Sequence, residues 1–163
     1  MTAPRSTSLK CFFAAWIFGW VIAIYVPSLL LAATELSPLA QGRGLPAAIL
    51  AVADEAAPAA KIGFAVLMGL FLFVARRLIR IQGAAAVAAD TMLALLAMLL
   101  MLALLPADWS RGFGIGMTGT RFAPAVTLIY LAGAGLAGLV FSLSEARCLR
   151  RTIPPQSTGS APG

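Results

Sequence analysis

Asp90 is the acidic residue of this sequence that stands inside a long apolar run, between Ala84 and Leu105. A carboxylate at the centre of a membrane span costs about 2.5–3.5 kcal/mol to insert. Intramembrane acids are therefore paired with a cation or used for function. Two interpretations of Asp90 stay open: an ion pair that holds two helices in register, or a coupling carboxylate of a small transporter.

Arg76 is the candidate partner of Asp90. A helix hairpin that turns near Gln82 and Gly83 would bring Arg76 level with Asp90. Each residue lies on a helix face rich in small residues, and such faces are where membrane helices pack closely. We therefore expect an Arg76–Asp90 ion pair near the cytoplasmic end of this hairpin.

Three further polar residues could line a path through the membrane or a packing face. Thr91 follows Asp90 directly, whereas Thr127 and Tyr130 share one face of the last apolar run with Ala134 and Gly138. A transporter needs polar groups near the middle of the membrane, and these are few. They keep open an oligomeric transporter or channel subunit as the alternative function.

The segment from Asp108 to Arg121 contains glycines in a G-x-G-x-G pattern, at Gly112, Gly114 and Gly116. It is not a phosphate-binding loop, because no strand precedes it and no Lys-Ser/Thr pair ends it. The alternation of apolar residues with glycines is consistent with an extended strip on the membrane surface or against a partner. A flexible loop that follows the lipid surface is the alternative. The candidate contacts of this outer loop are Trp109, Arg111, Phe113 and Arg121.

Missing residue types exclude several chemistries. The sequence contains no His and no Asn, which excludes His-dependent nucleophilic catalysis and the ordinary zinc and haem sites. The acids of the expected outer loops, Glu35, Asp54, Glu55 and Asp108, have no spacing that brings them together. We expect no enzyme activity, no cofactor and no metal.

Cys11 and Cys148 are the two cysteines of the chain. Both fall at the expected cytoplasmic ends of helices, and the cytosol keeps thiols reduced. We therefore expect two unpaired cysteines that act as small packing residues.

The composition is that of a membrane protein. Of 163 residues, 61% are apolar and 11% charged, against about 25% charged in a soluble domain. Four runs approach the ~20 residues that cross a bilayer. They predict an all-α integral membrane protein, an antiparallel four-helix bundle with spans at about 11–33, 57–75, 84–105 and 122–141. Residues 1–10 form a cytoplasmic N-terminus, 11–151 the membrane domain and 152–163 a disordered tail.

The positions of Lys and Arg predict the orientation. On one side of the four spans lie Arg5, Lys10, Arg76, Arg77, Arg80, Arg147, Arg150 and Arg151, and on the other Arg43, Lys61, Arg111 and Arg121. The richer side faces the cytoplasm, so both termini are cytoplasmic. The net charge of +6 suits the anionic inner leaflet of the bilayer, not nucleic acid, because no binding motif accompanies it.

The first apolar run has 23 residues, whereas the apolar region of a signal peptide has 7–15. We therefore expect a membrane span here, with a cleaved signal peptide as the alternative. Pro27 should kink it. Trp16 fits the inner interfacial belt of aromatic residues, whereas Trp20 lies deeper and should pack on a neighbouring helix. The segment from Ala47 to Ala57 is expected to form a short interfacial helix that begins near Pro46.

The sequence thus predicts a small multi-pass protein of a bacterial inner membrane without catalytic machinery. It would act as an accessory, assembly or structural subunit through helix and loop contacts, in a homo-oligomer or a larger membrane complex. Arg outnumbers Lys ten to two and Ala is abundant, a composition typical of high-GC bacterial genes.

Overall fold

The computed structural model describes residues 9–34, 36, 40–55, 58–78, 83–104 and 124–152. Apart from Thr34, Leu36, residues 40–44 and Gly83, these ranges are α-helical. The helices are α1 (Leu9–Ala33), α2 (Leu45–Glu55), α3 (Pro58–Leu78), α4 (Ala84–Leu104) and α5 (Pro124–Thr152).

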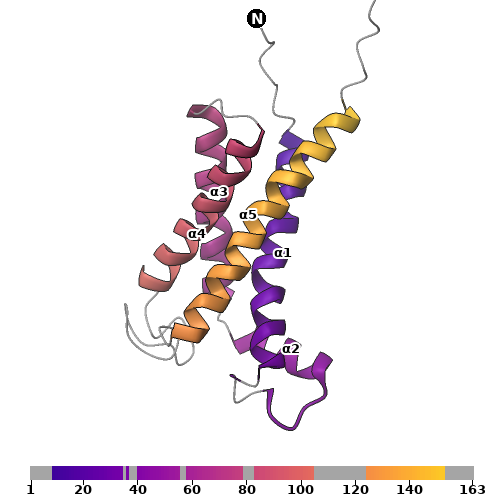
Figure 1. The fold of residues 1–163 in the computed structure, drawn as a ribbon, viewed down its shortest axis with the longest axis vertical. Helices are drawn as coiled ribbons and strands as arrows, with labels where there is room; N and C mark the ends of the chain where they lie inside the picture. The colour runs from indigo at the N-terminus through magenta and orange to yellow at the C-terminus, as the bar shows by residue number, and fades with distance from the viewer. Residues whose placement is uncertain are drawn as a thin grey trace, which may run out of the picture.

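The four longer helices lie side by side, and the short α2 crosses one end of α1 (Figure 1). The most extensive interface joins the first and last helices, α1 and α5, which run antiparallel. On its other flank α5 packs against α4, which in turn packs against α3. The start of α1, the end of α5 and the turn between α3 and α4 therefore lie at the same end of the molecule.

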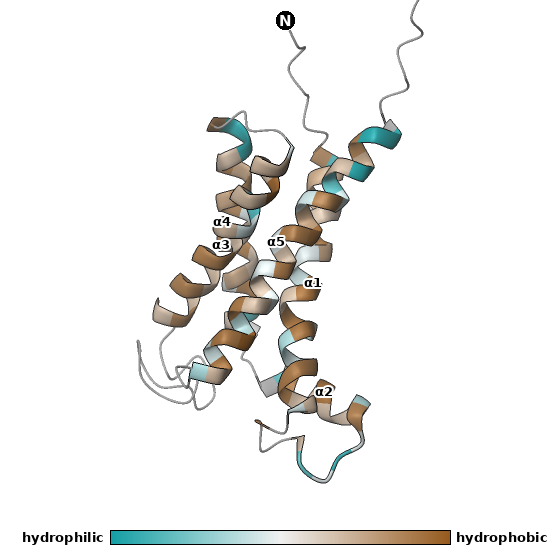
Figure 2. Ribbon diagram, viewed as in Figure 1, coloured by the Kyte–Doolittle hydropathy of each residue, from teal (hydrophilic) through white to brown (hydrophobic). Residues whose placement is uncertain are grey.

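Among the described residues, three helices are long and apolar enough to cross a membrane: Leu9–Ala33, Ala84–Leu104 and Pro124–Arg151. Apolar residues cover most of their length, and hydrophilic residues gather near the ends of α3 and α5 (Figure 2). Helix α3 is not in this set, since it carries Lys61 near its start and Arg76 and Arg77 in its last turn.

Helix α5 continues well beyond the apolar run that predicted it. The predicted span ended at residue 141, whereas the helix extends without a break to Thr152. The extension is amphipathic: Glu145 and Leu149 are buried and Arg147 and Arg150 are exposed. Hydropathy marks only the lipid-facing part of a helix, so it misses a final segment that packs on one face alone.

Small residues form the packed faces of α4 and α5, as their spacing predicted. Ala94, Ala97, Ala134 and Ala137 are fully buried. Where α4 meets α5, a Cβ atom at Gly138 would lie 2.7 Å from the Asp90 carbonyl oxygen. Side chains of this size allow the two backbones to approach closely.

The turn before α4 depends on a glycine. Gly83 has a φ of +68°, a conformation that glycine adopts without a steric penalty. Its carbonyl oxygen accepts hydrogen bonds from the amides of Ala86 and Val87, which begins α4. Helix α4 therefore begins directly after Gly83.

Helix α1 contains Pro27, which is fully buried against Gly133 of α5. The hydroxyl of the next residue, Ser28, donates to the carbonyl oxygen of Ile24 at 2.8 Å. Helix α2 begins at Leu45 with Pro46 in its first turn, so the expected short helix is present about two residues earlier than predicted. Ala48 and Val52 pack it against Leu31 and Ala32 of α1.

Candidate functional site: a buried ion-pair cluster

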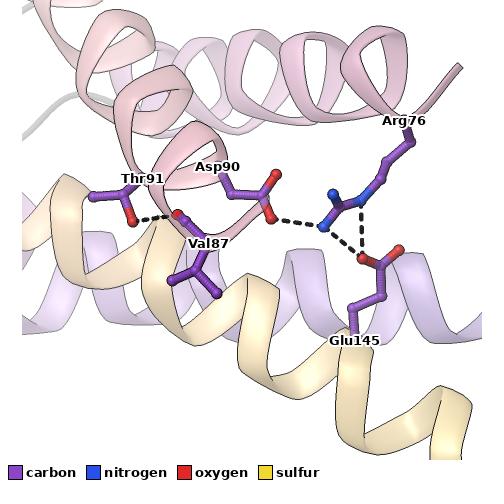
Figure 3. A network of polar contacts seen from close by, with 5 residues as sticks. All are labelled: Arg76, Val87, Asp90, Thr91 and Glu145. Carbon is purple, nitrogen blue, oxygen red and sulfur yellow. Dashed lines mark hydrogen bonds and ion pairs between the residues drawn. The ribbon is translucent and has the colours of Figure 1, made fainter. Parts of the chain in front are cut away.

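Arg76, Asp90 and Glu145 form a cluster that joins three helices (Figure 3). The guanidinium of Arg76 donates from Nη2 to Asp90 Oδ2 at 2.6 Å. Its Nε donates to Glu145 Oε2 at 3.0 Å, and Nη2 lies 2.8 Å from the same oxygen. One cation on α3 is thus shared by a carboxylate from α4 and a carboxylate from α5.

The packing of the helices places these side chains. Arg76 lies in the last turn of α3, which the Gly83 turn holds beside the first turns of α4. The close approach at Gly138 brings the next two turns of α5 toward Asp90, and the buried hydroxyl of Ser142 hydrogen-bonds the Asp90 side chain. The Arg76 guanidinium also lies 5.6 Å from the centre of the Phe141 ring.

The cluster is largely removed from solvent and lipid. Asp90 is 1% exposed and Glu145 4% exposed, whereas the side chain of Arg76 is 18% exposed. Glu145 Oε1 is buried and has no hydrogen-bond partner among the described residues. Charged groups in such a setting are stable only when they are paired, so the cluster depends on its own contacts.

A pocket of about 260 Å³ opens beside the cluster, between α3 and α4. Arg76 and Asp90 line it, and its apolar wall includes Ala86, Ala89, Met92 and Leu93. Both members of the Arg76–Asp90 ion pair thus border an open pocket.

The structure brings Arg76 and Asp90 together but not with the other residues of the possible path. The Thr91 hydroxyl donates to the Val87 carbonyl oxygen of its own helix at 2.9 Å. Tyr130 packs in the apolar clusters nearer the opposite end of α5. It is twelve residues from Ser142, about 18 Å along a helix, and Thr127 is farther still. The outer-loop residues Trp109, Arg111, Phe113 and Arg121 lie outside the described part of the chain.

The prediction of two unpaired cysteines is wrong. Cys11 and Cys148 are joined by a disulfide, with their Cα atoms 5.6 Å apart and 137 residues between them in sequence. The antiparallel packing of α1 and α5 brings the start of one beside the end of the other. Cys148 lies one helical turn beyond Glu145, so the disulfide holds α1 to α5 next to the ion-pair cluster.

Both tryptophans of α1 contact α3. Trp16 Nε1 donates to the Ala65 carbonyl oxygen at 2.9 Å, and Trp20 Nε1 donates to the Lys61 carbonyl oxygen at 3.0 Å. Their rings are stacked, with centroids 6.5 Å apart. Trp20 therefore packs on a neighbouring helix, as its depth predicted.

Glu145 is the member of the cluster that the sequence analysis missed. It follows the predicted end of the last span at residue 141, and no partner was predicted for it. A signal was present: Ala134, Gly138, Phe141 and Glu145 recur at helical spacing on one face. Among the described residues, no group of three or more potential ligands could hold a metal ion.

Comparison with protein-family models, curated proteins and solved structures gives no match for this chain. The described chain is all-helical, and its three long apolar helices are compatible with a small membrane protein. A buried charged contact joins three of its helices.

Proposed function

We propose that this chain is a four-span protein of a bacterial inner membrane that acts as an accessory, assembly or structural subunit of a larger membrane complex. It would work through helix and loop contacts, without catalytic machinery. Both termini would face the cytoplasm.

The disulfide supports an even number of membrane crossings. It joins the start of α1 to the end of α5, so both ends must lie on the same side of the bilayer. If only the three most apolar helices crossed, these ends would lie on opposite sides. A fourth crossing, by α3, would place both ends on the same side. This helix has Lys61 near its start and Arg76 and Arg77 in its last turn. Long basic side chains at the ends of a span can reach the interfaces.

The distribution of basic residues supports cytoplasmic termini. The described basic residues at the disulfide end are Lys10, Arg76, Arg77, Arg147, Arg150 and Arg151. Those toward the opposite end are Arg43 and Lys61. The positive-inside rule assigns the richer end to the cytoplasm. Disulfides in the cytosol are usually transient or redox-sensing. With cytoplasmic termini, the Cys11–Cys148 bond would be of this type.

The observation that carries the subunit role is the difference between the two outer faces of the bundle. The large apolar side chains exposed on α4 and α5 are Leu and Met, whereas α1 and α3 also expose Phe13, Phe18, Tyr25 and Phe73. Leu suits a lipid environment, and aromatic residues are enriched where proteins meet. The buried charged side chains of the described helices contact one another, which favours a structural role for them.

The test is purification in mild detergent at native expression, followed by identification of what co-purifies. We expect a larger membrane protein at a fixed stoichiometry, and its loss in the Phe13→Ala/Phe18→Ala variant. The matched control is Leu96→Ala/Leu99→Ala on α4, which removes exposed leucines from the opposite face and should retain the partner. A chain that purifies alone, or equal retention in both variants, would overturn the proposal.

The pocket beside Asp90 favours one second candidate, a small oligomeric transporter or channel subunit with Asp90 as its coupling carboxylate. Its signature in the same purification would be a homo-oligomer. A ligand-dependent or pH-dependent signal from that oligomer would have to disappear in Asp90→Asn.

Orientation has its own test. A reporter fused after Gly163 should be active in the cytoplasm and inactive in the periplasm. The opposite result would exclude the four-span topology with cytoplasmic termini.

A further inference from the structure

The ion-pair cluster contains more negative than positive charge. Arg76 supplies one positive charge, and Asp90 and Glu145 each supply a negative charge when ionised. The fully ionised cluster therefore carries a net charge of −1, with both carboxylates at least 96% buried, since Asp90 is 1% and Glu145 4% exposed. An uncompensated charge in such an environment costs several kcal/mol.

No second cation balances this charge among the described residues. On α3, the Arg77 guanidinium lies 5.3 Å from the centre of the Phe73 ring, and Arg77 is exposed. On α1, Lys10 is exposed and Cys11 is oxidised. On α5, Arg147 and Arg150 are exposed, and Asp90 is the acid that α4 contributes.

One oxygen of the cluster is open. The three contacts of Arg76 use Asp90 Oδ2 and Glu145 Oε2. Glu145 Oε1 is buried without a partner among the described residues, and in Figure 3 it points away from the Glu145–Arg76 bonds. A proton added at this position would leave every contact of Arg76 in place.

We propose that the carboxylate pair of Asp90 and Glu145 is a binding site for one proton. The proton comes from water and forms a carboxylic O–H bond, which changes the net charge of the cluster from −1 to zero. Arg76 balances the carboxylate that remains. When two carboxylates share a site, the proton belongs to the pair and not to one residue. This site does not depend on the subunit role proposed above.

Occupancy of the proton site depends on the charge balance of the cluster. The proton is present because two carboxylates share a single guanidinium. If either acid becomes an amide, the other is balanced by Arg76 and needs no proton. Both Glu145→Gln and Asp90→Asn should therefore release it, although each leaves one carboxyl group in place.

Infrared spectroscopy of the full chain in lipid nanodiscs at neutral pH tests this directly. A protonated carboxyl group has a C=O band that a carboxylate lacks, and isotopic labelling of Asp and Glu side-chain carboxyls shifts it. We expect the band in the wild type and in Asp54→Asn, whose aspartate is exposed. It should be absent from Glu145→Gln and from Asp90→Asn.

A wild-type spectrum without the band would overturn the proposal, and so would a band that persists in either single variant. If those variants fail to fold, one further variant tests whether the band comes from Asp90 and Glu145. Replacing Glu35, Asp54, Glu55 and Asp108 by their amides leaves Asp90 and Glu145 as the only acidic side chains. The band should persist there at wild-type intensity, and its loss would exclude the proton site.

Discussion

Gly138 of α5 lies directly against the backbone of Asp90 in α4. A Cβ atom at Gly138 would come within 2.7 Å of the Asp90 carbonyl oxygen and of the Thr91 Cα atom. Both obstacles are backbone atoms of a packed helix, which cannot turn aside as a flexible side chain would. The position of the Asp90 carboxylate therefore depends on a residue without a side chain on the neighbouring helix.

Gly138→Ala should push α4 and α5 apart and lower stability by about 1–3 kcal/mol, the usual cost of overpacking. Thermal unfolding in detergent measures it. Gly135→Ala is the matched control, because a Cβ atom there would meet its nearest neighbour at an ordinary 3.7 Å. Equal unfolding temperatures for the two variants would contradict the close contact.

Arg76→Gln should destabilise the protein more than Asp90→Asn. The first leaves the buried carboxyl groups of Asp90 and Glu145 without a cation, whereas the second leaves Arg76 paired with Glu145. Removal of one partner from a buried ion pair costs about 3–5 kcal/mol, and this is the loss of stability expected for Arg76→Gln.

The double variant Arg76→Gln/Asp90→Asn provides the control for pairing. It should be no less stable than Arg76→Gln alone, because the acid it removes has already lost its partner. Losses that simply add would mean that the two side chains act independently.

Trp16→Phe should cost about 1 kcal/mol, because it removes the donor of the hydrogen bond to Ala65 but keeps an aromatic ring. Tyr25→Phe, which also removes a polar atom from an aromatic residue of α1, is exposed and should have little effect. Their unfolding temperatures, measured side by side, make the comparison. A larger loss in Tyr25→Phe would argue against the contact of Trp16 with α3.

Reduction of the Cys11–Cys148 disulfide should lower stability by about 2–5 kcal/mol, because it releases a link between residues far apart in the chain. The unfolding temperature with and without a membrane-permeant reductant measures the change. The Cys11→Ser/Cys148→Ser variant should show no response to the reductant. In the wild type, a maleimide should label the denatured protein only after reduction.

The course of the chain was largely predictable, because long apolar runs have few alternatives to helices that cross a membrane. The boundaries of α4 follow from one uninterrupted run between Gly83 and Leu104. The end of α5 did not follow from hydropathy, because beyond Phe141 the helix is stabilised by burial of one face through Glu145 and Leu149. That burial depends on partners distant in sequence.

Part of the site was predictable because two of its residues are close together in the sequence. Arg76 and Asp90 are 14 residues apart across a single turn, so local geometry was enough to place them level with each other. Glu145 reaches Arg76 from 69 residues away, and Cys148 reaches Cys11 from 137. No pattern within one segment indicates which helix becomes its neighbour.

The extensive interface between α1 and α5 has a consequence for biosynthesis. Helix α1 leaves the ribosome before α5, so it finds its main partner only when α5 is complete. Until then, the α1 face that carries Cys11, Ala15 and Gly19 has no α5 to cover it. Assembly of the bundle must therefore be largely post-translational, and a chain that stops before α5 would present an open helix face to lipids, insertion factors or proteases.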